Sequence, residues 1–232
     1  MNSTKIIYQL FLLSCLYNNC IIRTYVSQVG QDKFLHERYF NDQRKGFFVD
    51  IGAHDGLEFS NTYFFEKELG WEGICFEPLA GAFELLLKNR NCMCVNACVG
   101  NTCGLVKFFA VKGYAEMLSG MVDTYHPLHF ARMKRDIAAH GGSYTIMDVP
   151  SVTLESILEK QGVYKIDYLS LDTEGGELEI LQSIDFNKIK ILAISVENNY
   201  EDPDIRTFLE SQGFEFITFL GGLDEIYVNN NF

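Results

Sequence analysis

The sequence predicts a doubly wound α/β domain with a mostly parallel sheet and an antiparallel hairpin at its C-terminal end. Three observations predict this fold: short apolar runs alternate with helix-like segments, the later apolar runs end in carboxylates, and two short strand-like runs close the chain. With 232 residues, of which 47% are hydrophobic, the chain can bury one substantial core. We therefore expect a single domain over 25–232, preceded by an apolar segment over 1–24.

The first half of this domain alternates regularly between strands and helices. The run at 47–51 is apolar and bounded by glycines, which is typical of a strand buried on both faces. Ser60 is the expected N-cap of the helix that follows. The predicted elements are strands at 47–51, 73–77 and 92–97 and helices at 60–69 and 83–89. This order predicts parallel strands.

Residues 98–150 break the alternation, so we expect an insertion there. Only 105–111 is strand-like, and the rest is rich in Gly, Met, His and Tyr. Such a segment forms either a lid over the substrate or an ordinary packed excursion. Its histidines, His126, His129 and His140, are placed where they could approach a substrate, but they lack partners at a defined spacing and are expected to be solvated.

Regular alternation returns after the insertion. Thr153 is the expected cap of a helix with an apolar stripe. The predicted elements are helices at 153–159, 177–184 and 205–212 and strands at 167–172, 191–197, 215–220 and 225–228. The last two strands are expected to pair as a hairpin at the edge of the sheet.

Charge and cysteine spacing limit the partners of the chain. A formal net charge of −12 disfavours nucleic acid, because phosphate binding needs clustered basic side chains. The seven cysteines lack the spacing of a zinc site, so we expect reduced thiols and a cytoplasmic location. The apolar segment at 1–24 is short for a stable membrane span and is expected to form an amphipathic helix that packs on the domain. The alternative is a weak signal peptide or anchor, which would give a secreted or anchored form. The sequence does not give the oligomeric state.

The segment Phe48–Gly56 predicts a nucleoside-binding turn. Gly52 and Gly56 follow the first strand, where glycine lets the backbone approach a ligand closely. Asp50 and Glu77 end the first and second strands, in the places of the acidic residues that accept ribose hydroxyls.

The same turn disfavours a dinucleotide. Asp55 lies where a pyrophosphate would bind, and its negative charge instead suits a cationic sulfonium ligand. A nicotinamide-dependent oxidoreductase is therefore disfavoured. His54 is a candidate for cofactor contact or for a catalytic base, and its alternative is a surface loop histidine.

Four separate blocks resemble the FkbM-type methyltransferases: Phe48–Gly56, Gly70–Pro78, Tyr168–Glu177 and Val196–Tyr200. The resemblance extends from Ser27 to the C-terminal strand. It implies a Rossmann-like class I methyltransferase fold, S-adenosyl-L-methionine as donor and O-methylation of a sugar or natural-product hydroxyl. The predicted cofactor residues are Asp50, Gly52, His54, Gly56 and Glu77.

Acidic residues at the ends of two later strands predict the acceptor site. Asp172 ends one strand, and Glu197 and Asn198 end the next, so their oxygen atoms are suited to Mg²⁺ or a similar cation. Their positions are similar to those in metal-dependent catechol and macrolide-sugar O-methyltransferases. A second interpretation is metal-free catalysis, with Asp172 and Glu174 as general base and positioning group. A third is that these carboxylates only cap the helix that follows.

The predicted function is therefore an S-adenosylmethionine-dependent O-methyltransferase that acts on a hydroxyl of a sugar, glycan or related small molecule. The alternative is a catalytically inactive Rossmann-like module that binds a glycan or a protein partner.

Overall fold

The computed structural model describes residues 23–230 and Phe232. The signal or anchor hypothesis for 1–24 lies outside the described residues, apart from Arg23 and Thr24. Within the described part of the chain, no helix combines the length and the apolar character that crossing a bilayer requires.

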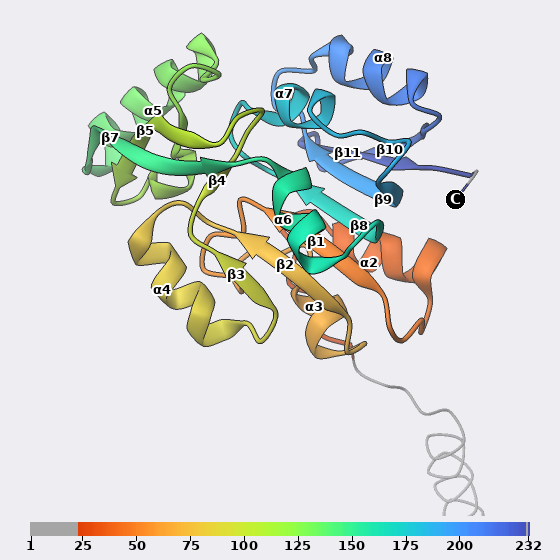
Figure 1. The fold of residues 1–232 in the computed structure, drawn as a ribbon. Coiled ribbons are helices and arrows are strands. Elements are labelled where there is room, and N and C mark those ends of the chain that lie inside the picture. The colour runs from red at the N-terminus through yellow and green to blue at the C-terminus, as the bar shows by residue number, and fades with distance from the viewer. Residues whose placement is uncertain (1–22, 231) are drawn as a thin grey trace, which may run out of the picture.

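A seven-stranded sheet forms the centre of the domain, in the order β10-β11-β9-β8-β1-β2-β3 (Figure 1). Its strands are β1 (Phe47–Ile51), β2 (Glu72–Phe76), β3 (Met93–Val95), β8 (Lys165–Leu171), β9 (Lys190–Glu197), β10 (Glu215–Leu220) and β11 (Asp224–Val228). β1, β2, β3, β8 and β9 pair in parallel, and β11 pairs antiparallel with both β9 and β10. The mostly parallel sheet with a C-terminal hairpin is confirmed.

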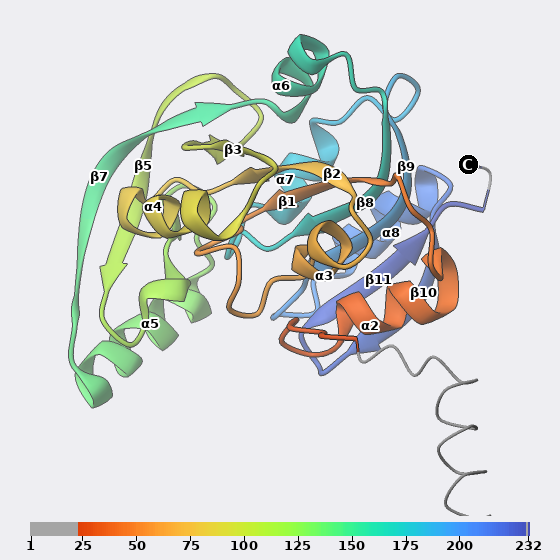
Figure 2. The ribbon, with the colours of Figure 1, turned by 90° about the horizontal axis from the view of Figure 1, so that it is seen from below.

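Helices cover both faces of this sheet (Figures 1 and 2). One face carries α6 (Leu154–Gln161), α7 (Glu177–Gln182) and α8 (Pro203–Ser211), and the other carries α2 (Gln31–Leu35), α3 (Tyr63–Lys67) and α4 (Ala80–Asn89). Successive side chains of a strand point to opposite faces. Val49 accordingly packs in the cluster of α6 and α7, whereas Phe48 packs in the cluster of α3 and α4.

The predicted boundaries hold best where a cap is present in the sequence. Thr153 Oγ1 accepts a hydrogen bond from the Ser156 amide, as predicted for the cap of α6. Ser60 accepts from the amides of Thr62 and Tyr63, although the regular helix begins only at Tyr63. α4 starts earlier than predicted. Its start could not be located in the sequence, because no side chain caps the first turn.

Residues 98–152 form a second sheet of four strands, in the order β4-β7-β5-β6. Its elements are β4 (Cys98–Val99), β5 (Gly104–Lys112), the 3₁₀ helix η2 (Glu116–Leu118), β6 (Gly120–Met121), α5 (Pro127–His140) and β7 (Ser143–Val152). β5 and β7 make a long antiparallel ribbon that extends away from the central sheet (Figure 2). α5 packs on this ribbon through Met133, which is buried with Val111 and Leu118.

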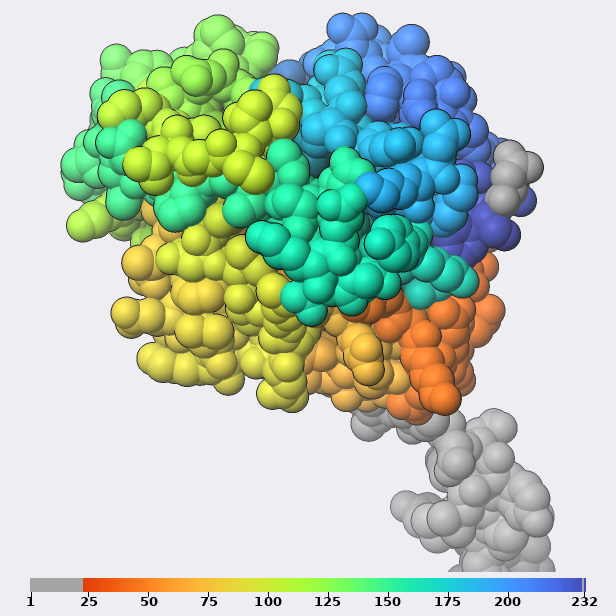
Figure 3. Space-filling view, viewed as in Figure 1, coloured from red at the N-terminus to blue at the C-terminus, as the bar shows by residue number. Residues whose placement is uncertain are grey.

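The sequence analysis missed α5 and β7. Two signals for α5 were present: Pro127 at the first helical position, and Gly141 and Gly142 after the last. The insertion lies against the rest of the domain in the space-filling view (Figure 3). One such contact joins Asn101 to Glu179 of α7.

Candidate active site

A cleft opens at the carboxyl ends of β1, β2, β8 and β9, where the strand order reverses between β1 and β8. Its empty space, including the open mouth, is about 1310 Å³. The predicted site residues that line it are Asp50, Gly52, His54, Glu77, Asp172, Glu174 and Glu197. Gly56 and Asn198 are not among its lining residues. The insertion supplies an apolar wall through Phe108, Leu118 and Met121.

Gly52 lines the cleft directly after β1, where the ends of β1 and β8 approach each other. Its backbone has a φ of +88°, and a Cβ atom there would lie 1.7 Å from the carbonyl oxygen of Asp172. Its amide donates to the Phe76 carbonyl of β2, while the Asp172 amide donates to the Ile51 carbonyl. Only glycine allows β8 and the β1 turn to approach this closely.

Glu77 is held at the end of β2 by the backbone of the neighbouring turns. Its two carboxylate oxygens accept from the amides of His54, at 3.0 Å, and Leu79, at 2.7 Å. Burial raises the pKa of Glu77 to about 7, against the lowering effect of the two amides. An ionised carboxylate can accept about four hydrogen bonds, so capacity remains for the hydroxyls of a ligand.

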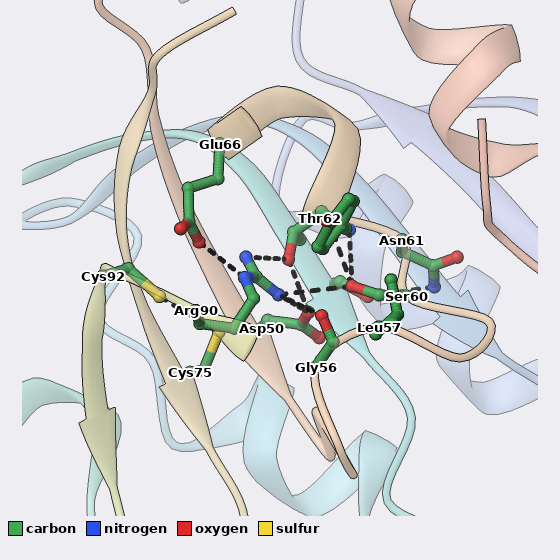
Figure 4. Close-up of polar contacts among 12 residues, drawn as sticks. Asp50, Gly56, Leu57, Ser60, Asn61, Thr62, Glu66, Cys75, Arg90 and Cys92 are labelled. Atoms are coloured by element: carbon green, nitrogen blue, oxygen red, sulfur yellow. Dashed lines mark hydrogen bonds and ion pairs between the residues drawn. The ribbon is translucent and has the colours of Figure 1, made fainter. Parts of the chain in front are cut away.

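Asp50 belongs to a buried polar network under the same turn (Figure 4). Its carboxylate accepts from the Thr62 hydroxyl at 2.6 Å and lies 3.8 Å from the Arg90 guanidinium. Arg90 also pairs with Glu66 and donates to Ser60 and Thr62. Burial raises the pKa of Asp50, and the Arg90 charge opposes that rise. Asp50 therefore fixes the turn and also reaches the cleft.

Two other residues of the turn have different surroundings. A Cβ atom on Gly56 would lie 2.5 Å from Leu86 and 2.7 Å from Arg90, so this glycine lets α4 pack closely under the turn. His54 has a φ of +47° and lines the cleft, with Nε2 3.9 Å from Glu116 of the insertion. Of the two, only His54 is placed to contact a ligand in the cleft.

Three carboxylates gather on the opposite side of Gly52. Asp172, Glu174 and Glu197 each offer one oxygen atom, and these atoms lie within 4.8 Å of one another. Burial is the largest cause that raises the pKa of each group well above its ordinary value, and the charge of a neighbouring carboxylate adds to the rise. The prediction that the ends of β8 and β9 bring acidic side chains together agrees with this geometry.

The backbone after β8 directs Glu174 into the cleft. Glu174 has a φ of +60°, which is uncommon for a residue with a side chain and costs about 1–3 kcal/mol when the surroundings impose it. Glu177 holds this loop, since one of its oxygens accepts from the amides of Thr173 and Gly175 and from the Thr173 hydroxyl. Among the described residues, no side chain caps α7 at Gly176, so the structure does not show the capping role that the third interpretation gave to Asp172 and Glu174.

Asn198 is not where the sequence analysis placed it. Its side-chain oxygen accepts from the Asp202 amide at 2.7 Å, and its side-chain nitrogen donates to the Asp202 carbonyl at 3.1 Å. The side chain thus closes the loop before α8, and both of its polar ends are occupied away from the three carboxylates. Asn198 therefore does not join Asp172 and Glu197 in the ligand set that the sequence predicted.

His129 is the residue that the sequence analysis missed. It was expected to be solvated, but it is 1% exposed on α5. Its Nδ1 atom lies 3.1 Å from the Tyr200 hydroxyl, and its Nε2 atom lies 3.1 Å from Glu174 Oε2. The sequence contains little indication of this position, because local spacing cannot show that α5 packs onto the loop after β8.

Comparison with known proteins matches residues 50–216, more than half of the chain, to the Methyltransferase FkbM domain. The chain belongs to the FkbM methyltransferase family. This confirms the resemblance that the four sequence blocks predicted. The FkbM chain is also similar to Methyltransferase sdnD from Sordaria araneosa, with 25% identity over 214 residues that cover 79% of this chain and 82% of that protein.

Solved structures show weaker likenesses to this FkbM chain. Methyltransferase FkbM from Methylobacillus flagellatus KT is 12% identical with a TM-score of 0.49, over 88% of this chain and 48% of that chain. The chain thus spans about half the length of that protein. A protein of the NADB-Rossmann superfamily from Streptococcus agalactiae is 14% identical with a TM-score of 0.43, over 89% and 69% of the two chains. At these scores, neither likeness adds to the assignment.

Family membership implies S-adenosyl-L-methionine as the methyl donor, and the residues on the β1 and β2 side of the cleft fit this cofactor. Glu77 presents a carboxylate that is already oriented by two amides. Leu79, Ala97 and Cys98 add small apolar surface beside it. Acidic lining side chains also suit the positive charge of a sulfonium.

Proposed function

We propose that this FkbM-family chain transfers a methyl group from S-adenosyl-L-methionine to a hydroxyl oxygen of a sugar, glycan or related small molecule. The observation that carries the proposal is that one cleft has Glu77 on one side of Gly52 and the carboxylates of Asp172, Glu174 and Glu197 on the other. Donor and acceptor positions then meet across Gly52, which has no side chain.

The donor side binds and orients the cofactor. S-adenosyl-L-methionine, when bound, supplies an electrophilic methyl group on a positively charged sulfur. Glu77 accepts hydrogen bonds from ribose hydroxyls, and Asp50 with Arg90 keeps the turn in place. The cofactor roles of Gly52 and His54 remain part of this proposal, whereas Gly56 acts through packing on α4.

The acceptor side orients a hydroxyl group and takes its proton. A carboxylate of Asp172 or Glu174 accepts the hydrogen bond of the hydroxyl, which points the oxygen toward the donor side. Phe108, Leu118 and Met121 of the insertion exclude water from the apolar face of the acceptor. The net charge of −12 disfavours a polyanionic acceptor such as nucleic acid and supports a small molecule or glycan.

The proposal is tested with purified protein, donor binding by calorimetry, and transfer of labelled methyl to a panel of glycans and small hydroxyl compounds. We expect saturable donor binding and a methyl ether in the product, identified by mass spectrometry. Asp172→Asn should lower turnover about 100-fold or more while donor affinity stays within about twofold. Glu77→Gln should weaken donor binding about tenfold, because one acceptor oxygen is lost.

Glu210→Gln, which removes an exposed carboxylate on α8, is the matched control and should change neither quantity. Absence of donor binding by the wild-type protein would overturn the proposal. Transfer to amines rather than hydroxyls would overturn its O-methylation part.

A further inference from the structure

We propose that the cleft binds a divalent transition-metal ion of the Mn²⁺ type through the carboxylates of Asp172, Glu174 and Glu197 together with the imidazole of His129. This ligand set replaces Asn198 of the sequence prediction with a histidine from the insertion. Ion binding itself does not depend on the proposed function; only the role of the ion toward the acceptor rests on it.

The three carboxylates repel one another when they are ionised. One oxygen atom of each lies within 4.8 Å of the other two, in a partly buried position. Among residues 23–230, no lysine or arginine forms an ion pair with any of the three. Arg132 lines the same cleft and its charge lowers the pKa of Glu174, but its guanidinium forms its ion pair with Asp136, at 3.9 Å, one turn further along α5. A bound cation would offset this repulsion.

His129 supplies an independent observation that indicates a ligand. Its side chain is 1% exposed, and neither its Nε2 atom nor the nearby Glu174 Oε2 atom has a hydrogen-bond partner of acceptable geometry in the described structure. A buried polar atom without a partner costs about 1–3 kcal/mol, so such atoms in a native protein call for an explanation. An ion contacted by both atoms would satisfy them together.

The distance between His129 and Glu174 fits two neighbouring ligands of one ion. His129 lies outside the group of three carboxylates whose oxygens are within 4.8 Å of one another, so it would reach the ion from beside Glu174. His129 Nε2 and Glu174 Oε2 are 3.1 Å apart. Adjacent ligands of an octahedral ion with bonds of about 2.1 Å are separated by about 3.0 Å. Tyr200 contacts the other ring nitrogen at 3.1 Å. When Nδ1 donates its hydrogen to the Tyr200 oxygen, Nε2 presents a lone pair, as in histidine ligands oriented by an outer partner.

The mixture of ligands selects the class of ion. Carboxylates alone suit Mg²⁺ and Ca²⁺, whereas an imidazole among carboxylates favours a first-row transition ion. In the proposed reaction, the ion would bind the acceptor oxygen and lower the pKa of its hydroxyl, so that a carboxylate takes the proton more readily.

The test measures ion binding directly on the full chain after chelator treatment. Calorimetric titration with Mn²⁺ should show one ion per chain, and His129→Asn and Glu174→Gln should each weaken binding about tenfold or more. His140→Asn, at the exposed end of the same helix, and Glu210→Gln on α8 are matched controls and should bind Mn²⁺ like the wild type. Each variant is checked for folding by thermal unfolding in chelator.

Pulsed electron paramagnetic resonance of the wild-type Mn²⁺ complex adds a readout that needs no variant. Coupling of the ion to an imidazole ¹⁴N nucleus is expected. Lack of saturable Mn²⁺ binding would overturn the site, and unchanged affinity in His129→Asn or absent nitrogen coupling would overturn the histidine ligand in favour of a direct His129–Glu174 hydrogen bond. Donor binding and methyl transfer are separate measurements, so their failure is distinguishable from failure of the ion site.

Discussion

Glu77 shows how one side chain can combine a binding role with a cost in stability. Its carboxylate ends β2, is 5% exposed, and accepts two backbone amides. Burial raises its pKa to about 7, so it changes charge near neutral pH. The ionised form is the better acceptor for ribose hydroxyls, and it is also the form that burial penalises.

This penalty predicts a pH dependence of folding stability. Because the folded-state pKa of Glu77, about 7, exceeds the ordinary value of 4.5, the folded protein retains a proton that the unfolded chain releases between these values. The contribution of this proton to the free energy of unfolding is fully present below pH 4.5 and is lost as the pH rises toward about 7. Between pH 5.5 and 8, the wild-type protein should lose about 2 kcal/mol of unfolding free energy relative to Glu77→Gln in urea titrations without ligand.

Glu210→Gln serves as the control for this experiment and should follow the wild-type curve. If the free energies of wild type and Glu77→Gln run parallel across this pH range, the carboxylate does not titrate near neutrality in the folded protein.

At the scale of elements, Arg90 joins the C-terminal end of α4 to β1, α3 and the turn between them. Its buried guanidinium pairs with Glu66, donates to Thr62 and lies 3.8 Å from Asp50 (Figure 4). It also lies over the ring of Phe48, 5.1 Å from the ring centre. Arg90 thereby offsets the charge of two buried carboxylates under the turn, and Lys67 also pairs with one of them, Glu66, at 2.8 Å.

Arg90→Met should destabilise the domain by about 3–5 kcal/mol, because Asp50 would be left buried without a basic partner and Glu66 would keep only Lys67. Urea unfolding at neutral pH measures the change. Arg135→Met removes an arginine whose side chain is 72% exposed, next to Asp136, and should cost less than about 1 kcal/mol. Equal effects of the two substitutions would show that the Arg90 network is not what holds the turn.

At the scale of the whole molecule, the insertion completes the site rather than merely extending the domain. It supplies the apolar wall of the cleft and carries His129 to Glu174. Its backbone also lies close to the loop after β8: a Cβ atom on Gly175 would lie 2.7 Å from the Thr124 carbonyl oxygen. One strand of the insertion sheet is far more open, since every residue from Ser143 to Asp148 of β7 is exposed.

Hydrogen exchange should therefore separate two regions of the molecule. Peptides from β1, β8 and β9 have both faces buried and should exchange most slowly, whereas Ser143–Asp148 of β7 should exchange about 100-fold faster or more. Mass spectrometry of peptides after timed exchange measures this. Equal protection of both regions would show that the insertion and the central sheet open as one cooperative unit.

The sequence by itself determined the central sheet and most of the acidic residues at the strand ends that line the cleft. Apolar runs, caps and glycines act over a few residues, so β1, α6, β8 and the final hairpin were predicted close to their observed bounds. The carboxylates of Asp50, Glu77, Asp172 and Glu197 were predictable because parallel strands bring their carboxyl ends to one edge of the sheet.

Only the tertiary structure decided which of these groups face one another. His129 contacts Tyr200, 71 residues away, and approaches Glu174 because α5 packs across the loop after β8. Gly56 and Asn198 were both predicted to belong to the site. Gly56 instead allows close packing against α4, and the side chain of Asn198 is hydrogen-bonded to the backbone of Asp202. Local sequence patterns specify helices and strands. Contacts between side chains that are distant in the sequence depend on how whole helices and strands pack, and a short stretch of sequence does not contain that information.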